Sequence, residues 1–242
     1  MTGRPSYFAP AFALGVEGAE PLAFRGVDLR EMPDHPENRF DLVIEPGTIA
    51  AIIGDEDSGV GDIGRFALGF DAPPGGEILV FGTAIATLPY FKVLVFRRRL
   101  GYLQVGDGLL QNLSLRGNIS LPLQYASDHQ TKAVEKRVDE LIVAFHLFSV
   151  AGRRPAEVNE EERRRAAIAR AVALDPELLI LESPFDGLTA RASRELLEDV
   201  KTRIDGTART IVITAQDLSS VITPLMHRIV RLVDGRAVEG GE

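Results

Sequence analysis

The stretch that decides the fold is NEEERRRAAIARAVALDPELLILESPFDGLTA, residues Asn159 to Ala190. Asn159 predicts a helix N-cap, since its side-chain oxygen can accept from the free amides of the first turn. Three glutamates follow it, at the positive end of the helix dipole, where acids are favoured. Asp175-Pro176 predicts the end of the helix, because the residue before a proline avoids the helical region. The apolar run Leu178 to Leu181 then fits a parallel strand covered on both faces.

The bulk composition narrows the class of protein. The chain has 242 residues, of which 45% are hydrophobic and 26% charged, enough for one sizeable globular domain. A net charge of −8 leaves no basic footprint for nucleic acid. The absence of cysteine excludes disulfides and cysteine-based metal sites or nucleophiles. No apolar run approaches the roughly 20 residues that span a bilayer. We expect a flexible N-terminal tail over residues 1–20 and one domain over residues 21–242.

The opening stretch also carries a family resemblance. Residues Arg164 to Leu188, RRAAIARAVALDPELLILESPFDGL, resemble the signature helix and Walker B region of ABC transporter ATPases. The family pattern there is LSGGQ, an AIARAL helix core, four apolar residues, Asp-Glu-Pro and a D-loop. The scaffold residues match this pattern, whereas the chemical residues differ. The signature positions are Val158, Asn159, Glu160, Glu161 and Glu162, and the Walker B positions are Glu182 and Ser183.

A second motif lies between an apolar strand, Thr48 to Ile53, and a helical pattern, Ile63 to Phe70. That context fits a phosphate-binding loop, GxxxxGK[ST], in which backbone amides and a helix N-terminus hold phosphate. The resemblance places Val60 at the position of the lysine and Gly61 at that of the metal-binding hydroxyl. This degenerate Walker A loop consists of Gly54, Asp55, Glu56, Asp57, Ser58, Gly59, Val60, Gly61 and Asp62.

The four carboxylates of this loop argue against bound phosphate. One like-charge contact at 4 Å costs about 4 kcal/mol at an effective dielectric constant of 20. Since about 1.4 kcal/mol is tenfold in affinity, one or two such contacts and the missing lysine predict a loss of ordinary ATP binding. We hypothesise that the carboxylates of the loop occupy the amide nest that phosphate would fill. Carboxylates that point to solvent would contradict this hypothesis.

Residues Leu100 to Leu123, LGYLQVGDGLLQNLSLRGNISLPL, resemble the segment that begins with the Q-loop in importer-like and lipid-exporting ABC ATPases. The family glutamine aligns with Val105. Gln104 lies one position early, which in a strand turns its side chain to the opposite face. Gln216 stands at the position of the switch histidine. The resemblance implies that a membrane permease contacts Leu109, Leu110, Asn112 and Leu113.

The resemblance covers the chain from about Pro21 to its end. It implies an α/β fold, with a P-loop NTPase-like ABC ATPase core, a β-rich edge and a helical subdomain inserted over about residues 100–170. Residue patterns independently predict secondary structure across the chain. They indicate strands over Pro21–Arg30, Arg39–Glu45 and Thr210–Thr214, helices over Ser127–Leu147 and Ala192–Ile204, and a closing hairpin over His227–Arg236.

Phosphoryl transfer needs positioned phosphates, a metal and an oriented water. Because residues for all three are replaced, the leading hypothesis is a pseudo-ATPase subunit of a membrane transporter, peripheral on the cytoplasmic face. It docks a permease and pairs with a second, active ATPase subunit, whose γ-phosphate its signature acids oppose. No catalytic residue, metal site or cofactor is expected. A resemblance to the ATPases of MCE/Mla-type lipid transporters implies a lipid or related cargo.

Two alternatives stay open. In the first, the chain is a functional ABC subunit that binds and hydrolyses Mg-ATP at an atypical site made by Gln104, Glu182 and Arg65. In the second, it is a soluble scaffold or regulator without a transporter partner. Apolar groups within Leu109 to Leu123 argue against that second alternative, because exposed apolar groups need a partner.

Overall fold

The computed structural model describes residues 18–30, 39–126, 131–202 and 209–239. Its centre is a six-stranded sheet in the order β5-β6-β7-β3-β8-β9, in which only the β8–β9 pair is antiparallel. These strands are β3 Ile49–Gly54, β5 Leu100–Leu103, β6 Leu178–Glu182, β7 Thr210–Ala215, β8 Arg228–Val233 and β9 Arg236–Glu239. A three-stranded antiparallel sheet lies beside it, made of β1 Leu22–Asp28, β2 Phe40–Ile44 and β4 Gly75–Val80.

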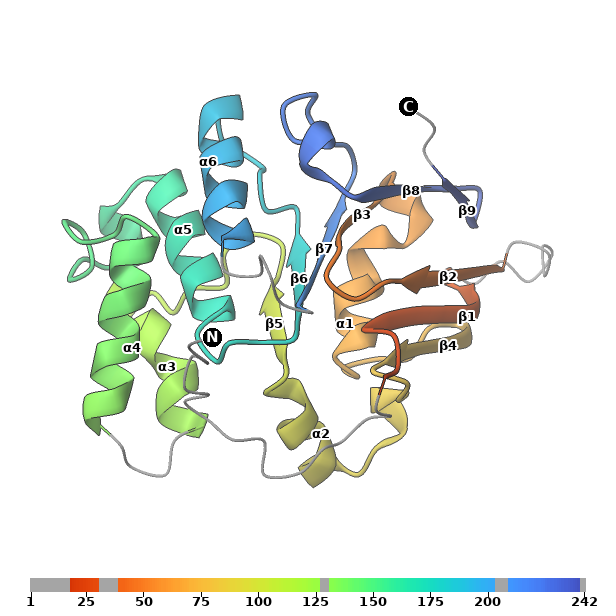
Figure 1. Ribbon diagram of the computed structural model, residues 1–242, viewed down its shortest axis with the longest axis horizontal. Helices are drawn as coiled ribbons and strands as arrows, with labels where there is room; N and C mark the ends of the chain where they lie inside the picture. Colours follow the sequence, from red (N-terminus) through yellow and green to blue (C-terminus); the bar gives the residue numbers. More distant parts are fainter. Residues whose placement is uncertain (1–17, 31–38, 127–130, 203–208, 240–242) are drawn as a thin grey trace.

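The helices of residues 115–201 cover one face of the central sheet, and the small sheet lies on its other side with the helices of residues 63–97 (Figure 1). The helices are α1 Ile63–Ala67, α2 Tyr90–Arg97, α3 Leu115–Ala126, α4 Thr131–Ala144, α5 Glu160–Ala171 and α6 Ala190–Lys201. The described residues therefore form an α/β fold with a β-rich edge and a helical part, as the sequence predicts.

The central sheet is buried on both faces, because alternate residues of its strands enter two separate cores. On β6, Leu179 and Leu181 join the core shared with α3, α4, α5 and α6. Leu178 and Ile180 join the core shared with the small sheet and α1. The predicted wholly apolar strand is confirmed, since all of β6 is buried.

The helical part departs from the predicted bounds at two points. Leu100–Leu103 pairs with β6 in the sheet, so the helices begin after it and not at residue 100. Helix α5 ends at Ala171, before the predicted stop at Asp175-Pro176. The chain leaves the helix in turns, with Val172 as its C-cap and Asp175 at a φ of 59°. Proline thus follows the end of the helix without setting it.

The remaining sequence predictions hold with shifts of a few residues at their ends. Phe40, Leu42 and Ile44 are buried on β2 while the residues between them are exposed. The closing hairpin turns at Asp234-Gly235, where both residues have positive φ. Residues 1–17 of the expected N-terminal tail and Ser127–Gln130 of the predicted helix lie outside the described residues.

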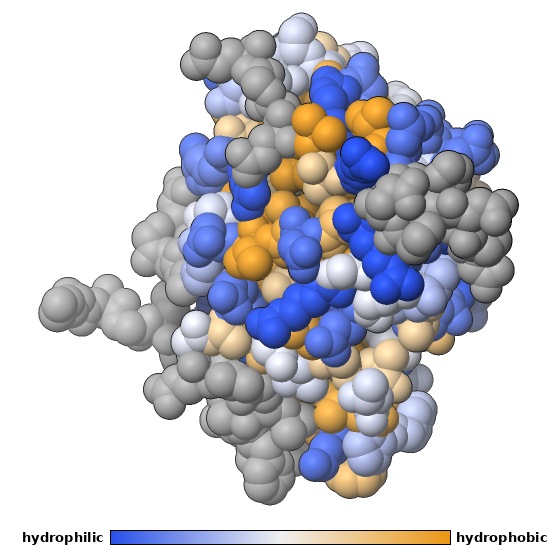
Figure 2. Space-filling model, turned by 90° about the vertical axis from the view of Figure 1, so that its right-hand side faces the viewer, coloured by the Kyte–Doolittle hydropathy of each residue, from blue (hydrophilic) through white to orange (hydrophobic). Residues whose placement is uncertain are grey.

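In the described ranges, no helix is long and apolar enough to cross a bilayer. Figure 2 shows the side of the small sheet and the β8–β9 hairpin, where apolar atoms gather among polar ones. The large exposed apolar residues of these strands are Val43, Val233 and Val238, each at least 36% exposed. Scattered exposure of this kind is normal for a globular surface.

Candidate functional site

The candidate site lies where four parallel strands of the central sheet end. Strand order places β5, β6, β7 and β3 side by side, so the residues that follow them meet at one sheet edge. Ligands of open α/β sheets bind outside such carboxyl ends. The fold therefore gathers Gly54, Gln104, Glu182 and Gln216 from four distant parts of the sequence.

The loop from Gly54 to Asp62 folds into two short 3-10 turns, Glu56–Ser58 and Val60–Asp62. These turns use three backbone amides of the loop internally. Ser58 N donates to Asp55 O at 3.2 Å, and Asp62 N donates to Gly59 O at 3.0 Å. The amide of Val60 donates to Ser58 Oγ at 3.2 Å. A phosphate-binding loop needs amides that point at the ligand, and these have protein acceptors instead.

The hypothesis that carboxylates fill the amide nest is wrong. Asp55, Glu56 and Asp57 are exposed, and no hydrogen bond in the described part of the chain joins their carboxylates to an amide of the loop. Asp62 lies 3.7 Å from Arg30 in an ion pair. The hydroxyl of Ser58 takes the inward position, because it also donates to Asp55 O at 2.7 Å. A short neutral side chain satisfies the loop without the cost of desolvating a carboxylate.

Val60 and Gly59 face inward. Val60 is 5% exposed and belongs to the core between α1 and the small sheet. Gly59 has a φ of 80°, and a Cβ there would lie 2.6 Å from Leu29 Cβ. The loop is therefore packed against the residues that follow β1, and the side chain at the predicted lysine position points into the core.

Glu182 is a buried acid at the end of β6, with 3% of its surface exposed. Its Oε2 atom accepts from the amide of Val105 at 3.2 Å, while Oε1 is buried without a hydrogen-bond partner. Burial raises the pKa of Glu182, and interactions with Tyr102 and the amide of Val105 oppose that increase. The carboxylate thus ties the end of β6 to the segment after β5.

Tyr102 and Gly64 complete this contact, and sequence reasoning missed both. Burial and the nearby Glu182 carboxylate raise the pKa of the Tyr102 phenol. A Cβ at Gly64 would overlap Glu182 Oε1 and lie 2.5 Å from Tyr102 Cε2. Only a glycine lets α1 approach this closely. Its unusual place inside a helical pattern was the one available sequence signal.

Two of the three groups of the atypical nucleotide site, Arg65 and Gln104, are exposed, whereas Glu182 is buried. Arg65 is exposed and donates to Asp71, with Nε at 2.9 Å from Oδ2. Gln104 is exposed and lies beside Gly108, whose Cβ position is 2.8 Å from Gln104 Nε2. Strand β5 ends at Leu103, so strand alternation does not decide where Gln104 points. Gln216, at the predicted switch position, is also exposed.

The signature positions form a well-capped helix start. Asn159 Oδ1 accepts from the amide of Glu162 at 2.9 Å, and Glu162 Oε2 accepts from the amide of Asn159 at 3.0 Å. The predicted N-cap is thereby confirmed as a capping box. The carboxylate of Glu160 lies against Gly187, where a Cβ would approach Glu160 Cδ to 2.5 Å. Val158 O accepts from Arg163 Nη1 at 3.1 Å.

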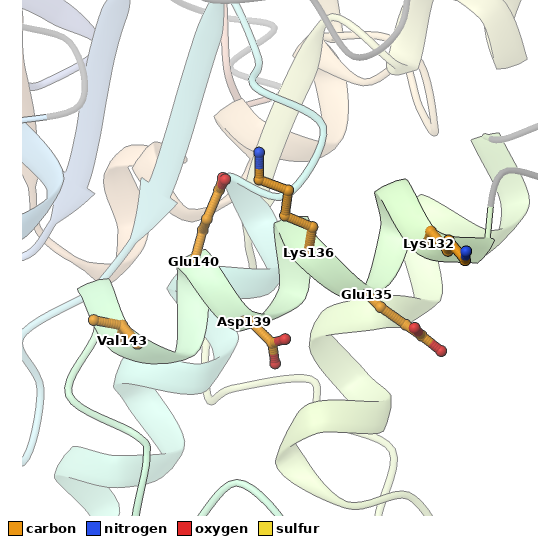
Figure 3. Close-up of a pocket in the computed structure, with 6 residues that line it drawn as sticks. All are labelled: Lys132, Glu135, Lys136, Asp139, Glu140 and Val143. Carbon is orange, nitrogen blue, oxygen red and sulfur yellow. The ribbon is translucent and has the colours of Figure 1, made fainter.

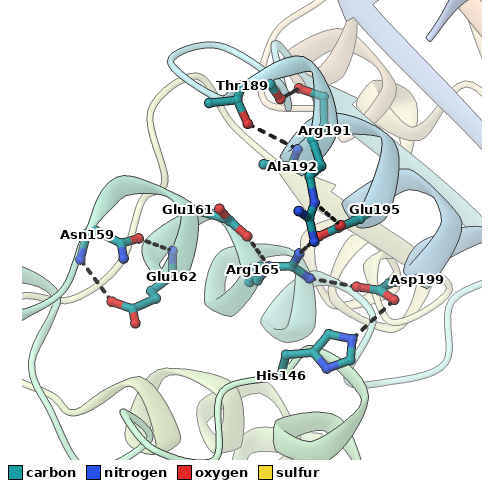
Figure 4. A network of polar contacts seen from close by, with 11 residues as sticks. His146, Asn159, Glu161, Glu162, Arg165, Thr189, Arg191, Ala192, Glu195 and Asp199 are labelled. Atoms are coloured by element: carbon teal, nitrogen blue, oxygen red, sulfur yellow. Dashed lines mark hydrogen bonds and ion pairs between the residues drawn. The ribbon is translucent and has the colours of Figure 1, made fainter. Parts of the chain in front are cut away.

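A polar network connects this helix start to α6 (Figure 4). Arg165, 6% exposed, donates to Glu161 Oε1 at 2.9 Å and to Asp199 Oδ2 at 2.6 Å. His146 Nε2 lies 3.5 Å from Asp199 Oδ1. Glu195 interacts with Arg191, which lowers the pKa of that carboxyl. These contacts give Glu161 a partner within the chain.

Arg164, 4% exposed, is a third residue that sequence reasoning missed. Its Nη1 atom donates to Gly106 O at 2.6 Å and to Ser183 O at 3.3 Å, and its Nη2 atom donates to Asp186 O at 3.3 Å. Burial lowers the pKa of this guanidinium, which nevertheless stays charged as arginines do. One side chain of α5 therefore holds the segments after β5 and β6 together.

Arg170 adds two further bonds, to Gly108 O at 2.6 Å and to Asp107 O at 3.1 Å. The sequence signal was a run of arginines beside the apolar positions of α5, which is more often a solvated face.

The predicted permease-contact residues divide into buried and exposed ones. Leu109 is 5% exposed and belongs to the helical core, so it is not available as a surface contact. Leu110 is 44% exposed, Asn112 is exposed, and Leu113 is partly buried. The side chain of Asn118 holds this segment, because Nδ2 donates to Leu110 O at 3.1 Å and Oδ1 accepts from its amide at 2.7 Å.

A shallow pocket lies on the outer face of α4, away from the candidate site. Figure 3 shows its charged side chains spread along one helix, pointing away from the backbone. The lining residues are Lys132, Glu135, Lys136, Asp139, Glu140 and Val143. Oppositely charged residues at such spacing are typical of a solvated helix surface. In the described ranges, no group of three acidic or histidine residues is arranged to hold a metal.

Comparisons with known proteins agree with this fold. The ABC transporter family model matches residues 38–186. The methionine import ATP-binding protein MetN of Cereibacter sphaeroides is 30% identical over 203 residues, covering 83% of this chain and 56% of that protein. The sulfate/thiosulfate import ATP-binding protein CysA of Caulobacter vibrioides is 28% identical over 224 residues, covering 91% of this chain and 64% of that protein. The chain thus spans between 56% and 64% of the length of these two relatives.

Solved structures show the same architecture. The ATP-binding cassette MJ0796, in a dimeric post-hydrolysis state bound to ADP and Pi, matches with a TM-score of 0.79 and 20% identity, over 90% of this chain and 97% of that one. The structure of cbiO1 from Clostridium perfringens matches with a TM-score of 0.79 and 18% identity, over 92% of this chain and 88% of that one. With the P-loop NTPase fold and a family match over more than half its length, the chain belongs to the ABC transporter family.

Proposed function

We propose that this chain is a catalytically degenerate ABC-transporter subunit that neither binds nor hydrolyses ATP in the ordinary way. The observation that carries the proposal is the loop from Gly54 to Asp62, in which three amides bond within the loop and the Val60 side chain lies in the core. A phosphate group would need to displace those bonds and to approach three exposed carboxylates without a lysine. The residues present do not fit Mg-ATP.

The groups after β6 and β7 support the same proposal. Water activation in phosphoryl transfer needs a group that orients the nucleophile. Ser183, at the position of the catalytic glutamate, is a poor base at neutral pH. Its amide donates to Thr214 O at 2.7 Å, and its φ is 42°. Glu182 Oε2 accepts from the amide of Val105, so this buried carboxylate is used to join two segments of the chain.

The signature positions support loss of function in the partner's site as well. In the family, two such domains enclose ATP, with each signature facing the other's phosphate loop. Glu160 and Glu161 stand at the helix start where the family has two glycines. Their negative charge would oppose a γ-phosphate. We therefore propose a heterodimer with a second, competent ATPase subunit, in which this chain contributes structure and not phosphate contacts.

The chain is also proposed to dock an integral-membrane permease on the cytoplasmic face. After exclusion of the buried Leu109, the surface for that contact consists of Leu110, Asn112 and the accessible part of Leu113. Because this surface is small, an experiment must distinguish permease docking from the alternative of a scaffold without a transporter partner. Recovery of the chain with a membrane protein from detergent extracts supports the permease. Recovery only with soluble proteins contradicts it.

Two classes of cargo, lipid and small solute, are suggested by different resemblances. The segment from Leu100 to Leu123 resembles ATPases of lipid transporters, which supports a lipid or related cargo. MetN and CysA are named for import of methionine and of sulfate or thiosulfate. Identification of lipid or solute in the purified transporter separates the two cargo classes.

Hydrolysis by the assembled transporter tests the proposal of inactivity. Substitution of the phosphate-loop lysine of the second ATPase subunit should abolish all ATP hydrolysis by the complex. The control variant is Asp57→Asn of this chain, an exposed loop acid, which should leave the rate unchanged. Hydrolysis that survives the partner substitution would show that this chain has a working site and would overturn the proposal.

A further inference from the structure

Helix α2 presents an exposed apolar face that none of the functions above uses. Val93 and Phe96 anchor the helix, since both are buried in the core with the small sheet. On the opposite side, Tyr90 is 74% exposed, Phe91 66% and Leu94 47%. Helical spacing places residues 90, 94 and 98 in one row, with residue 91 beside it. Arg98 is exposed as well, so the row combines apolar groups with a cation.

The surroundings of α2 are basic although the chain as a whole is acidic. The net charge is −8, yet the sequence from Gly82 to Gly106 contains no acid and has one lysine and three arginines. Arg99 pairs with Glu177 at 2.6 Å. Lys92 and Arg98 form no ion pair with any carboxylate of the described residues. Their charge is therefore not neutralised at close range.

Arg97 is a third cation for which no described carboxylate is an ion-pair partner. Its Nε atom donates to Leu68 O at 2.8 Å, its Nη2 atom to Gly69 O at 3.3 Å, and its Cζ atom lies 4.1 Å from the ring centre of Phe70. These partners are neutral, so they position the guanidinium and leave its charge in place. Phe70 is itself 53% exposed and extends the apolar surface.

We propose that the exposed face of α2 docks on an anionic phospholipid surface. Aromatic side chains favour the level of lipid headgroups, and basic side chains are attracted to anionic lipids. The acids elsewhere on the chain do not prevent this, because charges more than about 8 Å apart are largely screened at physiological ionic strength. Helix α2 lies at the edge of the fold (Figure 1), and its three apolar side chains are exposed there, which suits a flat surface. Nothing in the proposal depends on nucleotide or on a permease.

Sedimentation with vesicles tests the proposal on the full chain. Vesicles of phosphatidylcholine with about one third phosphatidylglycerol should bind the chain at 0.15 M salt, and pure phosphatidylcholine vesicles should not. The double variant Lys92→Gln/Arg98→Gln should bind the anionic vesicles about 30-fold more weakly, since each basic residue near such a surface contributes about fivefold. The triple variant Tyr90→Ser/Phe91→Ser/Leu94→Ser should also lose binding while keeping its circular dichroism.

A matched control uses the lysines of α4 drawn in Figure 3. Lys132 and Lys136 are exposed but lie among Glu135, Asp139 and Glu140. Lys132→Gln/Lys136→Gln makes the same change in charge and should leave vesicle binding intact. Equal loss in both double variants would mean a general charge effect and would overturn the proposal. It would also be overturned if no variant changed vesicle binding, or if the α2 variants released a protein partner and had no effect on lipid.

Discussion

The backbone amide of Val105 donates to Glu182 Oε2 at 3.2 Å, so the end of β6 is bonded to the segment that leaves β5. The acid that makes this bond is 3% exposed and leaves its other oxygen, Oε1, without a partner. In the described residues, the site where a nucleotide would lie is therefore bridged by the chain itself. This relationship leads to one prediction about pH and to one about packing.

Glu182→Gln should change how stability depends on pH. Burial raises the pKa of Glu182 in the folded state, so the folded chain holds this proton more tightly than the unfolded chain. The stability that Glu182 contributes by binding this proton is fully present below its unfolded pKa of about 4.3. It is lost as the pH rises through the folded pKa. Urea unfolding from pH 4 to pH 8 should show wild type losing stability relative to Glu182→Gln. The exposed Glu135→Gln should parallel wild type, and a Glu182→Gln curve parallel to wild type would contradict the prediction.

Gly64→Ala should destabilise the fold, because the added Cβ would overlap Glu182 Oε1 and press on Tyr102. We expect a loss of about 1–3 kcal/mol in the free energy of unfolding, as for other overpacked positions. Gly61→Ala is the control, since a Cβ there meets nothing within 4 Å, and it should change stability by less than about 0.5 kcal/mol. Equal effects of the two substitutions in urea unfolding would contradict the packing at Gly64.

Arg164→Met should loosen the segment from Gly106 to Gly108. The substitution keeps an apolar stem but removes the donors to Gly106, Ser183 and Asp186. Three carbonyls would lose a charged partner, at a cost of about 1.5–3 kcal/mol. Hydrogen exchange should accelerate in that segment more than in α6. Arg194→Met, which removes only the exposed pair with Glu198, should leave both stability and exchange nearly unchanged.

Val60→Lys should not create a phosphate site. Val60 is 5% exposed in an apolar core, so the ammonium would be buried or would force the loop outward. We expect a loss of at least about 2 kcal/mol of stability and no gain in nucleotide affinity. Thermal unfolding and calorimetry with Mg-ATP measure the two effects. A stable Val60→Lys chain that binds ATP would show that the loop needs only a lysine to function.

Much of the fold was accessible from sequence because its signals are local. The apolar run of β6, the alternation on β2 and the capping box at Asn159 each depend on residues close in the chain. The glycine spacing of the loop also predicted its place between a buried strand and a helix. These features follow from backbone geometry and periodicity, which distant contacts alter little.

The candidate site was less predictable because its contacts join distant segments. Arg164 donates to carbonyls 58 and 19 residues away, so its run of arginines reads as a solvated face until the fold buries it. The sequence also did not predict that Ser58 Oγ accepts from the amide of Val60, for a different reason. Four carboxylates dominated the electrostatic argument, yet the small hydroxyl reached the loop amide without desolvating a charge.

Calorimetric titration of the purified chain with Mg-ATP at millimolar concentration tests the central claim most directly. The internally bonded loop, the buried Val60 and the loop carboxylates predict no saturable heat of binding. A competent ABC ATPase subunit under the same conditions provides the positive control. Saturable binding by this chain that excess ADP abolishes would contradict the account. It would require the loop from Gly54 to Asp62 to open and hold phosphate.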